Sequence, residues 1–159
     1  MEDQITNLLA QKAQMTLEAM IDIEDGQEIS LFEKVTIGRQ EKIAQYSKPT
    51  TEIMIDDESE FLYTFQKHHR SRSTILLISI FVKGLTEAAE KKKLNLKDLV
   101  ITELEDNPTF DDLGISSQII GVENGVRMEG TGKTAKLFSA ARIRVKVKLS
   151  NPAGNPTGP

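Results

Sequence analysis

The sequence predicts one α+β domain, in which an antiparallel or mixed β-sheet carries an N-terminal helix and a central helix packed on one face. Apolar residues recur at helical spacing over 4–20 and 85–104, whereas other stretches alternate as strands do. The chain has 159 residues, the length of a single domain. We expect residues 1–150 to form that domain and residues 151–159, rich in Pro, Gly and Asn, to be a flexible C-terminal tail.

The chain begins with a helix, a turn and a strand. The helix over 4–20 has Asp3 as its N-cap and ends before the turn signal Asp25-Gly26. Residues 29–37 alternate between apolar and polar side chains, which predicts a strand that is bent or broken near its middle.

The next segment alternates between polar loops and short strands. We expect a loop over 45–51, since it contains a proline, and a short strand over 52–55. An acidic turn over 56–60 and a strand over 61–65 follow, and then a basic loop over 68–73.

The most apolar segment, 74–82, predicts a central strand, because its side chains are apolar on both faces. A helix covers one face in this interpretation, and a second layer or a neighbouring subunit covers the other. The helix over 85–104 contains the lysine run 91–93, which suggests a kink or two short helices, and Asn107-Pro108 ends it.

The last third predicts a connector over 109–114 and a strand over 116–123. Asn124-Gly125 is a strong hairpin signal, although the residues after it make a poor partner strand. A glycine-rich loop over 130–134 precedes the final strand.

The final strand, 141–149, has one apolar and one cationic face, because apolar residues alternate with basic ones. Three interpretations of the cationic face remain open: a solvated edge strand, contact with an acidic protein surface, or contact with a DNA backbone. The basic side chains are those of Arg142, Arg144, Lys146 and Lys148.

An acidic cluster is the candidate partner of this face in a neighbouring subunit. A solvated turn is the simpler explanation of the cluster, and its spacing is not that of a calcium loop. Its members are Glu52, Asp56, Asp57, Glu58 and Glu60, of which the last four are candidate interface residues.

Composition and motifs argue against catalysis, cofactors and metals. The net charge is −4, and no cysteine is present to form a disulfide or a thiolate site. His68 and His69 are adjacent and would point to opposite faces of an extended chain, so they converge poorly on a metal. The loop over 130–134 contains Gly-Lys-Thr but lacks the first glycine of a phosphate loop.

The ends of the chain and its apolar runs predict a cytoplasmic protein with no membrane partner. The N-terminus is acidic, with no apolar signal region after it, and the densest apolar run, 75–82, is too short to span a bilayer.

The order of these segments resembles the tail terminator proteins of tailed phages, the family of the U-type minor tail protein. The resemblance rests on the leading helix over 5–20, the strands over 52–55 and 73–82, and the helix after Gly84. The most telling piece is the end of that helix and its connector, Leu-x-Asp-Asn-Pro-Thr-Phe-x-Asp-Leu in the family's pattern, at 104–113 here.

The resemblance implies a structural virion protein and no enzyme. Such a protein forms a homohexameric ring that caps the tail tube, ends its polymerisation and provides the docking surface for the head-completion or neck protein. It would be assembled in the host cytoplasm and contact DNA non-specifically in the lumen. The alternatives are another neck, head–tail connector or tail tube protein, or a DNA-binding module.

Overall fold

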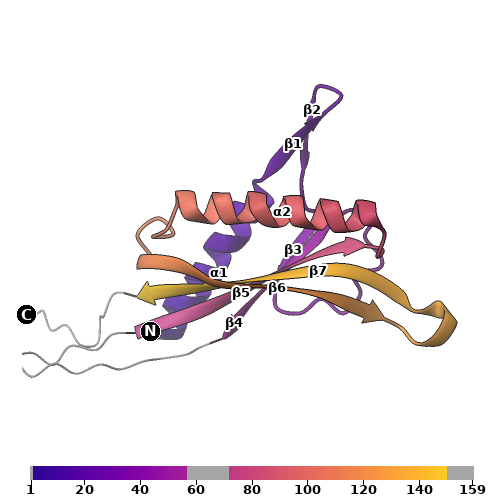
Figure 1. The fold of residues 1–159 in the computed structure, drawn as a ribbon. Helices are drawn as coiled ribbons and strands as arrows, with labels where there is room; N and C mark the ends of the chain where they lie inside the picture. The colour runs from indigo at the N-terminus through magenta and orange to yellow at the C-terminus, as the bar shows by residue number, and fades with distance from the viewer. Residues whose placement is uncertain (1, 57–71, 150–159) are drawn as a thin grey trace, which may run out of the picture.

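The structure, a computed structural model, describes residues 2–56 and 72–149 and confirms the α+β class (Figure 1). A mixed five-stranded sheet has the order β3-β4-β5-β7-β6, and β1 and β2 form a separate hairpin. The helices are α1 (Glu2–Glu18) and α2 (Glu87–Asp106). The strands are β1 (Ile21–Glu24), β2 (Gln27–Ser30), β3 (Lys34–Ile37), β4 (Thr50–Asp56), β5 (Arg72–Lys83), β6 (Gly114–Glu129) and β7 (Lys136–Leu149). The predicted strand over 61–65, the adjacent histidines and the C-terminal tail lie outside the described residues.

The centre of the sheet is the antiparallel pair β5 and β7, which pair from Arg72↔Leu149 to Lys83↔Phe138. The prediction of a central strand over 74–82 is therefore confirmed. The interpretation of 141–149 as an edge strand is wrong, because β6 pairs along the other side of β7. The sequence pattern of β7 could not reveal this position, since period-2 alternation occurs in both edge and interior strands.

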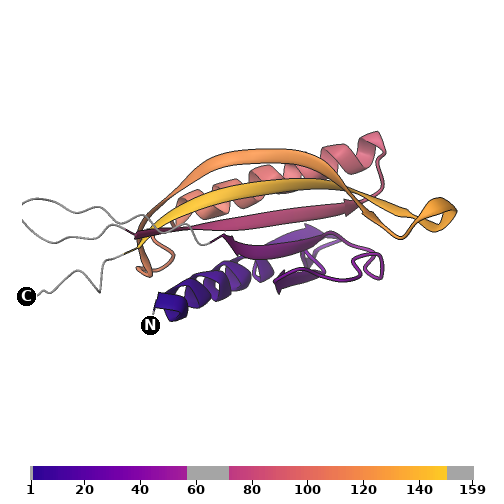
Figure 2. The same ribbon diagram turned by 90° about the horizontal axis from the view of Figure 1, so that it is seen from below.

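The alternation of β5 and β7 divides the sheet into two faces. On one face, every second side chain of β5 and β7 packs with buried residues of both helices in a single core. These strand residues are Leu76, Ile78, Ile80, Val82, Ile143, Val145, Val147 and Leu149. α1 packs against β3 and β4, and α2 against β5 and β7. Figure 2 shows α2 behind β5, β7 and β6, so the other face of these strands is turned away from it.

α2 is one uninterrupted helix, so neither a kink nor two short helices is found. Thr86 caps its start by accepting a hydrogen bond from the Ala89 N–H at 3.1 Å. Within the lysine run, Lys93 is only 1% exposed, and its ammonium lies 2.5 Å from Glu90. The helix continues here because the lysine stem packs in the core while its charge is paired one turn back.

The hairpin predicted at Asn124-Gly125 is wrong, because β6 runs through both residues to Glu129. The chain turns at Gly130 and a short 3₁₀ turn, Gly132–Thr134, before β7 begins. β7 offers a pairing partner to the whole of β6, and a turn at Asn124 would leave residues 136–140 of β7 without that partner. Non-local pairing therefore overrides the dipeptide signal.

Two boundaries near the N-terminus also differ from the prediction. α1 ends at Glu18, two residues before the predicted end, and Ile21–Glu24, for which no element was predicted, pairs with β2 around the predicted turn Asp25-Gly26. The strand expected over 29–37 is broken, as its sequence suggested, between β2 and β3.

The connector after α2 contains three consecutive residues with positive φ, at Phe110, Asp111 and Asp112. Its Phe110 side chain is buried in the core, and the Asp111 carboxylate pairs with Lys12 of α1. The hydrogen bond from Lys12 lowers the pKa of Asp111 below its ordinary value of 3.8. The ion pair thus ties α1 to the end of α2.

We predict that Asp111→Asn lowers the free energy of unfolding at neutral pH and that this loss disappears in acid. The pKa of Asp111 is lower in the folded than in the unfolded protein. Its carboxylate therefore stabilises the folded state fully at any pH above the unfolded-state pKa, and this stabilisation is lost as the pH falls through the folded-state pKa. Urea unfolding of both proteins across this range measures the difference. A difference that stays constant in strong acid would contradict the assignment to the carboxylate.

Candidate functional site on the open face of the sheet

The sheet face turned away from α2 carries the four basic side chains of β7, at Arg142, Arg144, Lys146 and Lys148. They are not equally solvated: the first and last are exposed, and the middle two are half-buried. Arg142 Nε donates to Ser79 Oγ at 3.2 Å, and Arg144 Nη1 lies 3.8 Å from Glu123 Oε1. The predicted cationic face exists, but its neighbours partly engage it.

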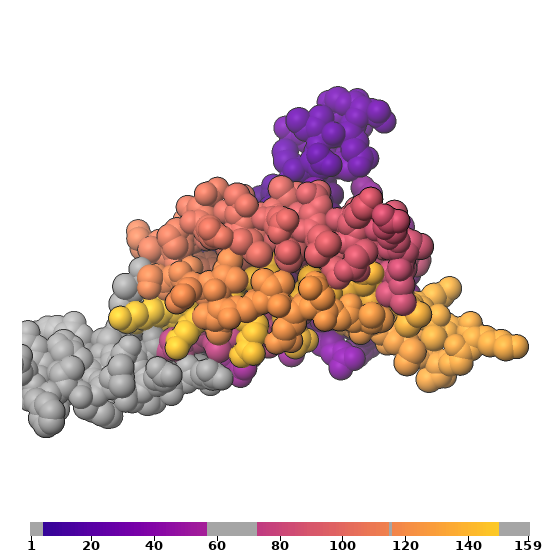
Figure 3. Space-filling view, in the orientation of Figure 1, coloured from indigo at the N-terminus to yellow at the C-terminus, as the bar shows by residue number. Residues whose placement is uncertain are grey.

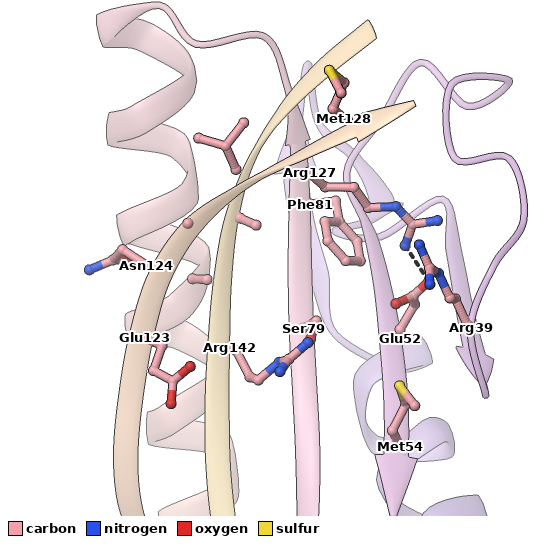
Figure 4. A pocket seen from close by; sticks show the side chains of 14 residues that line it. Arg39, Glu52, Met54, Ser79, Phe81, Glu123, Asn124, Arg127, Met128 and Arg142 are labelled. Atoms are coloured by element: carbon pink, nitrogen blue, oxygen red, sulfur yellow. Dashed lines mark hydrogen bonds and ion pairs between the residues drawn. The ribbon is translucent and has the colours of Figure 1, made fainter. Parts of the chain in front are cut away.

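A groove of about 530 Å³ lies at the Arg142 end of this face. Figure 4 shows the groove from the face turned away from α2, which lies behind β6 and β7. The lining is apolar at Met54, Phe81 and Met128, basic at Arg39 and Arg142, and acidic at Glu123. The groove therefore offers an apolar floor with two arginines and one glutamate around it.

The deepest polar group in the groove is the ion pair of Arg127 and Glu52, whose side chains are 11% and 6% exposed. Arg127 Nη1 donates to Glu52 Oε1 at 2.6 Å, and Nη2 donates to the Gln40 carbonyl. The same Glu52 oxygen accepts the Gln40 N–H at 2.6 Å. The Arg127 guanidinium also lies over the Phe81 ring, 5.0 Å from its centre. One oxygen of the carboxylate thus accepts from both Arg127 and the Gln40 backbone in a structural network.

The same network holds the segment between β3 and β4 against the sheet. Glu129 accepts the backbone N–H groups of Ile43 and Ala44 at 2.7 and 2.8 Å. Ile43 is buried with Phe81 and Phe138 in a second, smaller apolar cluster. Part of the second cover expected for β5 therefore comes from the chain itself.

The predicted acidic cluster does not stay together as an exposed surface. Glu52, expected in a solvated or intersubunit cluster, is 4% exposed and bound to Arg127. This part of the prediction is wrong, because alternation in β4 places Glu52 on the groove face opposite Ser79. Asp56 is exposed at the end of β4, whereas Asp57, Glu58 and Glu60 lie outside the described residues.

The structure also describes the glycine-rich loop that contains Gly-Lys-Thr. The loop over 130–134 connects two antiparallel strands and contains only a three-residue 3₁₀ turn, without the helix that a phosphate loop requires. Within residues 2–56 and 72–149, no group of three or more His, Cys, Asp and Glu side chains could hold a metal ion. No helix in the described part is long and apolar enough to cross a membrane.

Sequence reasoning missed the residues that build the groove. Arg127 contacts Glu52 and Gln40 across 75 and 87 residues of chain, and no local pattern indicates such contacts. Arg127 lies on the same sheet face as Glu123 and Arg142 because of the register in which β6 pairs with β7. A hairpin at Asn124-Gly125 would have given a different register.

We predict that Arg127→Met destabilises the protein by about 3–5 kcal/mol, because it leaves the Glu52 carboxylate buried without its cation. Lys148→Met, on the same sheet face but exposed, is the matched control and should change stability by less than about 0.5 kcal/mol. Urea unfolding measures both changes. Adding Glu52→Gln to the Arg127→Met variant should restore part of the lost stability. If it does not, the unpaired carboxylate is not the cause of the destabilisation.

The sequence was compared with protein-family models and with curated proteins. No protein-family model matches it, and a search of curated proteins finds no match. The arguments for function therefore come from the residues and their geometry.

Proposed function

We propose that this protein is a structural, ring-forming subunit that caps a phage tail tube, as its resemblance to tail terminators suggests. The assembly part of the proposal is supported by the edge of the sheet at β6, which pairs with no further strand in the part of the chain that the structure describes. β6 is an edge strand of 16 residues; two register irregularities and three charged residues interrupt it, but its sequence contains neither lysine nor proline. Its exposed apolar side chains are Ile120, Val122, Val126 and Met128.

A long edge strand with exposed apolar side chains is a liability for a protein that stays monomeric. Its backbone N–H and C=O groups on the open side can pair with another chain, and its side chains gain from burial. The opposite edge, β3, has only four residues, so the two edges of the sheet differ. Contacts between unlike surfaces of identical subunits are heterologous, and they close into a ring when their rotation divides the circle.

A ring supports the capping role by geometry alone. When the symmetry of the ring matches that of the tube, every subunit meets one tube subunit, so that weak contacts add up. The half-exposed cationic row of β7 offers each subunit a charged surface for such contacts. The mechanism needs binding and shape and makes no use of catalysis.

We expect the purified protein to stop the growth of tail tubes. In a mixture with polymerising tube protein, electron microscopy should show short tubes with one end occupied by a six-membered ring. Tubes that keep growing with both ends bare would remove this function. Rings with twelvefold symmetry that bind portal in place of tube would favour the connector alternative.

The charge-reversed variant Arg144→Glu/Lys146→Glu should assemble less well than the wild type. Exposed ion pairs contribute only about 0.2–1 kcal/mol each, but a ring repeats them in every subunit. Lys91→Glu/Lys133→Glu makes the same change of net charge at exposed sites outside the row and is the control. Sedimentation at low and high salt measures assembly, and equal behaviour of the two variants would contradict a role of the row.

A further inference from the structure

The β1–β2 hairpin is an arm that projects beyond α2 and adds nothing to the main core (Figures 1 and 3). Seven of its eight strand residues are exposed. A two-stranded hairpin is marginally stable in water by itself, so an arm of this kind gains most from packing on a partner.

The chemistry of the arm is acidic and apolar. Between Ile21 and Ser30 the sequence contains four carboxylates and no basic residue. The register pairs Ile21 with Ser30 and Ile23 with Glu28, so these four side chains share one face of the hairpin. Ile21 and Ile23 are 48% and 68% exposed. This face presents two isoleucines beside a carboxylate.

The groove on the open face of the sheet has the complementary chemistry. Its exposed Met54 and Met128 provide apolar surface, and Arg39 and Arg142 are exposed at its rim. In the part of the chain that the structure describes, neither arginine has a carboxylate partner, whereas Arg127 is already paired with Glu52. The two arginines thus match the Glu28 carboxylate on the isoleucine face of the arm, although Glu123 also lines the groove, opposite Arg142 in the register.

We propose that the β1–β2 arm of one copy docks in the groove of a second copy, with Ile21 and Ile23 on the apolar floor and Glu28 at the arginines. The arm cannot reach its own groove, because α2 and the sheet lie between them (Figures 1 and 4). The contact is heterologous and supplies the head-to-tail step of the proposed ring, and in this sense it rests on the proposed function. It names the arm, and not the acidic cluster over 56–60, as the acidic partner.

Cysteine cross-linking tests the contact directly, because the native chain contains no cysteine. Chains with Ile23→Cys are mixed with larger, tagged chains that carry Met54→Cys and treated with a short bis-maleimide. The control partner is Met15→Cys, a methionine on α1 that is 60% exposed. The groove partner should give about tenfold more linked heterodimer than the control, because docking raises the local concentration of the two thiols. Equal yields would overturn the proposal.

Charge reversal separates the arm from the acidic cluster. Glu28→Lys on the Ile23→Cys chain should reduce the linked product, and Arg142→Glu on the Met54→Cys chain should restore part of it. The Glu28 and Arg142 side chains are both exposed, so we expect these variants to fold. If Asp57→Lys/Glu58→Lys removes the product while Glu28→Lys leaves it unchanged, the cluster is the partner and the proposal is wrong.

A mixing experiment tests the head-to-tail geometry. Ile23→Asp chains lack a working arm and Arg142→Glu chains a working groove, so each alone should stay monomeric at concentrations where the wild type assembles. Together they should form pairs but no closed rings, because only one good contact can form per pair. Closed rings from either variant alone would overturn the arm contact and leave tube capping standing. Specific cross-linking of Ile23→Cys to Met54→Cys together with unhindered tube growth would support the arm contact and contradict the proposed tube capping.

Discussion

The antiparallel ladder between β5 and β7 is the constraint on which the rest of the structure depends. It joins twelve residues of β5 to β7 without a shift of register, and it fixes which side chains share a face. A slip by one residue would move the β7 arginines into the core and its valines into water. The apolar core, the cationic row and the position of the groove all follow from this single register.

The two sides of the ladder have different energetic roles. On the helix side, burial of branched aliphatic side chains stabilises the fold, and Lys93 is tolerated because its ammonium reaches Glu90. On the open side, the Arg127 and Glu52 pair is costly to desolvate and is supported by the Gln40 backbone and by Phe81. Its main effect is positional, since it fixes the segment between β3 and β4 and so shapes one wall of the groove.

Sequence patterns predicted the elements whose signals are local. The strict alternation of β7, the two-sided apolar run of β5 and the helical spacing of α1 and α2 each lie within one segment, and each element is present. The hairpin at Asn124-Gly125 failed because the length of β7 decides where β6 ends. The groove could not be predicted at all, because it brings together residues of the 38–49 segment, β4, β5, β6 and β7. Only the register of the strands, which no single segment specifies, places Arg127 beside Glu52.

The separation of the core from the exposed surfaces has a consequence for assembly. The arm contributes no residue of its two strands to the core, and the Met54 and Arg142 side chains of the groove are exposed. A subunit can therefore fold before it meets a partner, and association then adds contacts without rearranging the core. The arm and the groove lie on opposite sides of the sheet. A contact between the arm of one copy and the groove of the next therefore repeats with the same rotation. An open row of subunits has one unused arm at one end and one unused groove at the other. Closure removes both free ends at once, which favours a finished ring over an open oligomer of the same subunits.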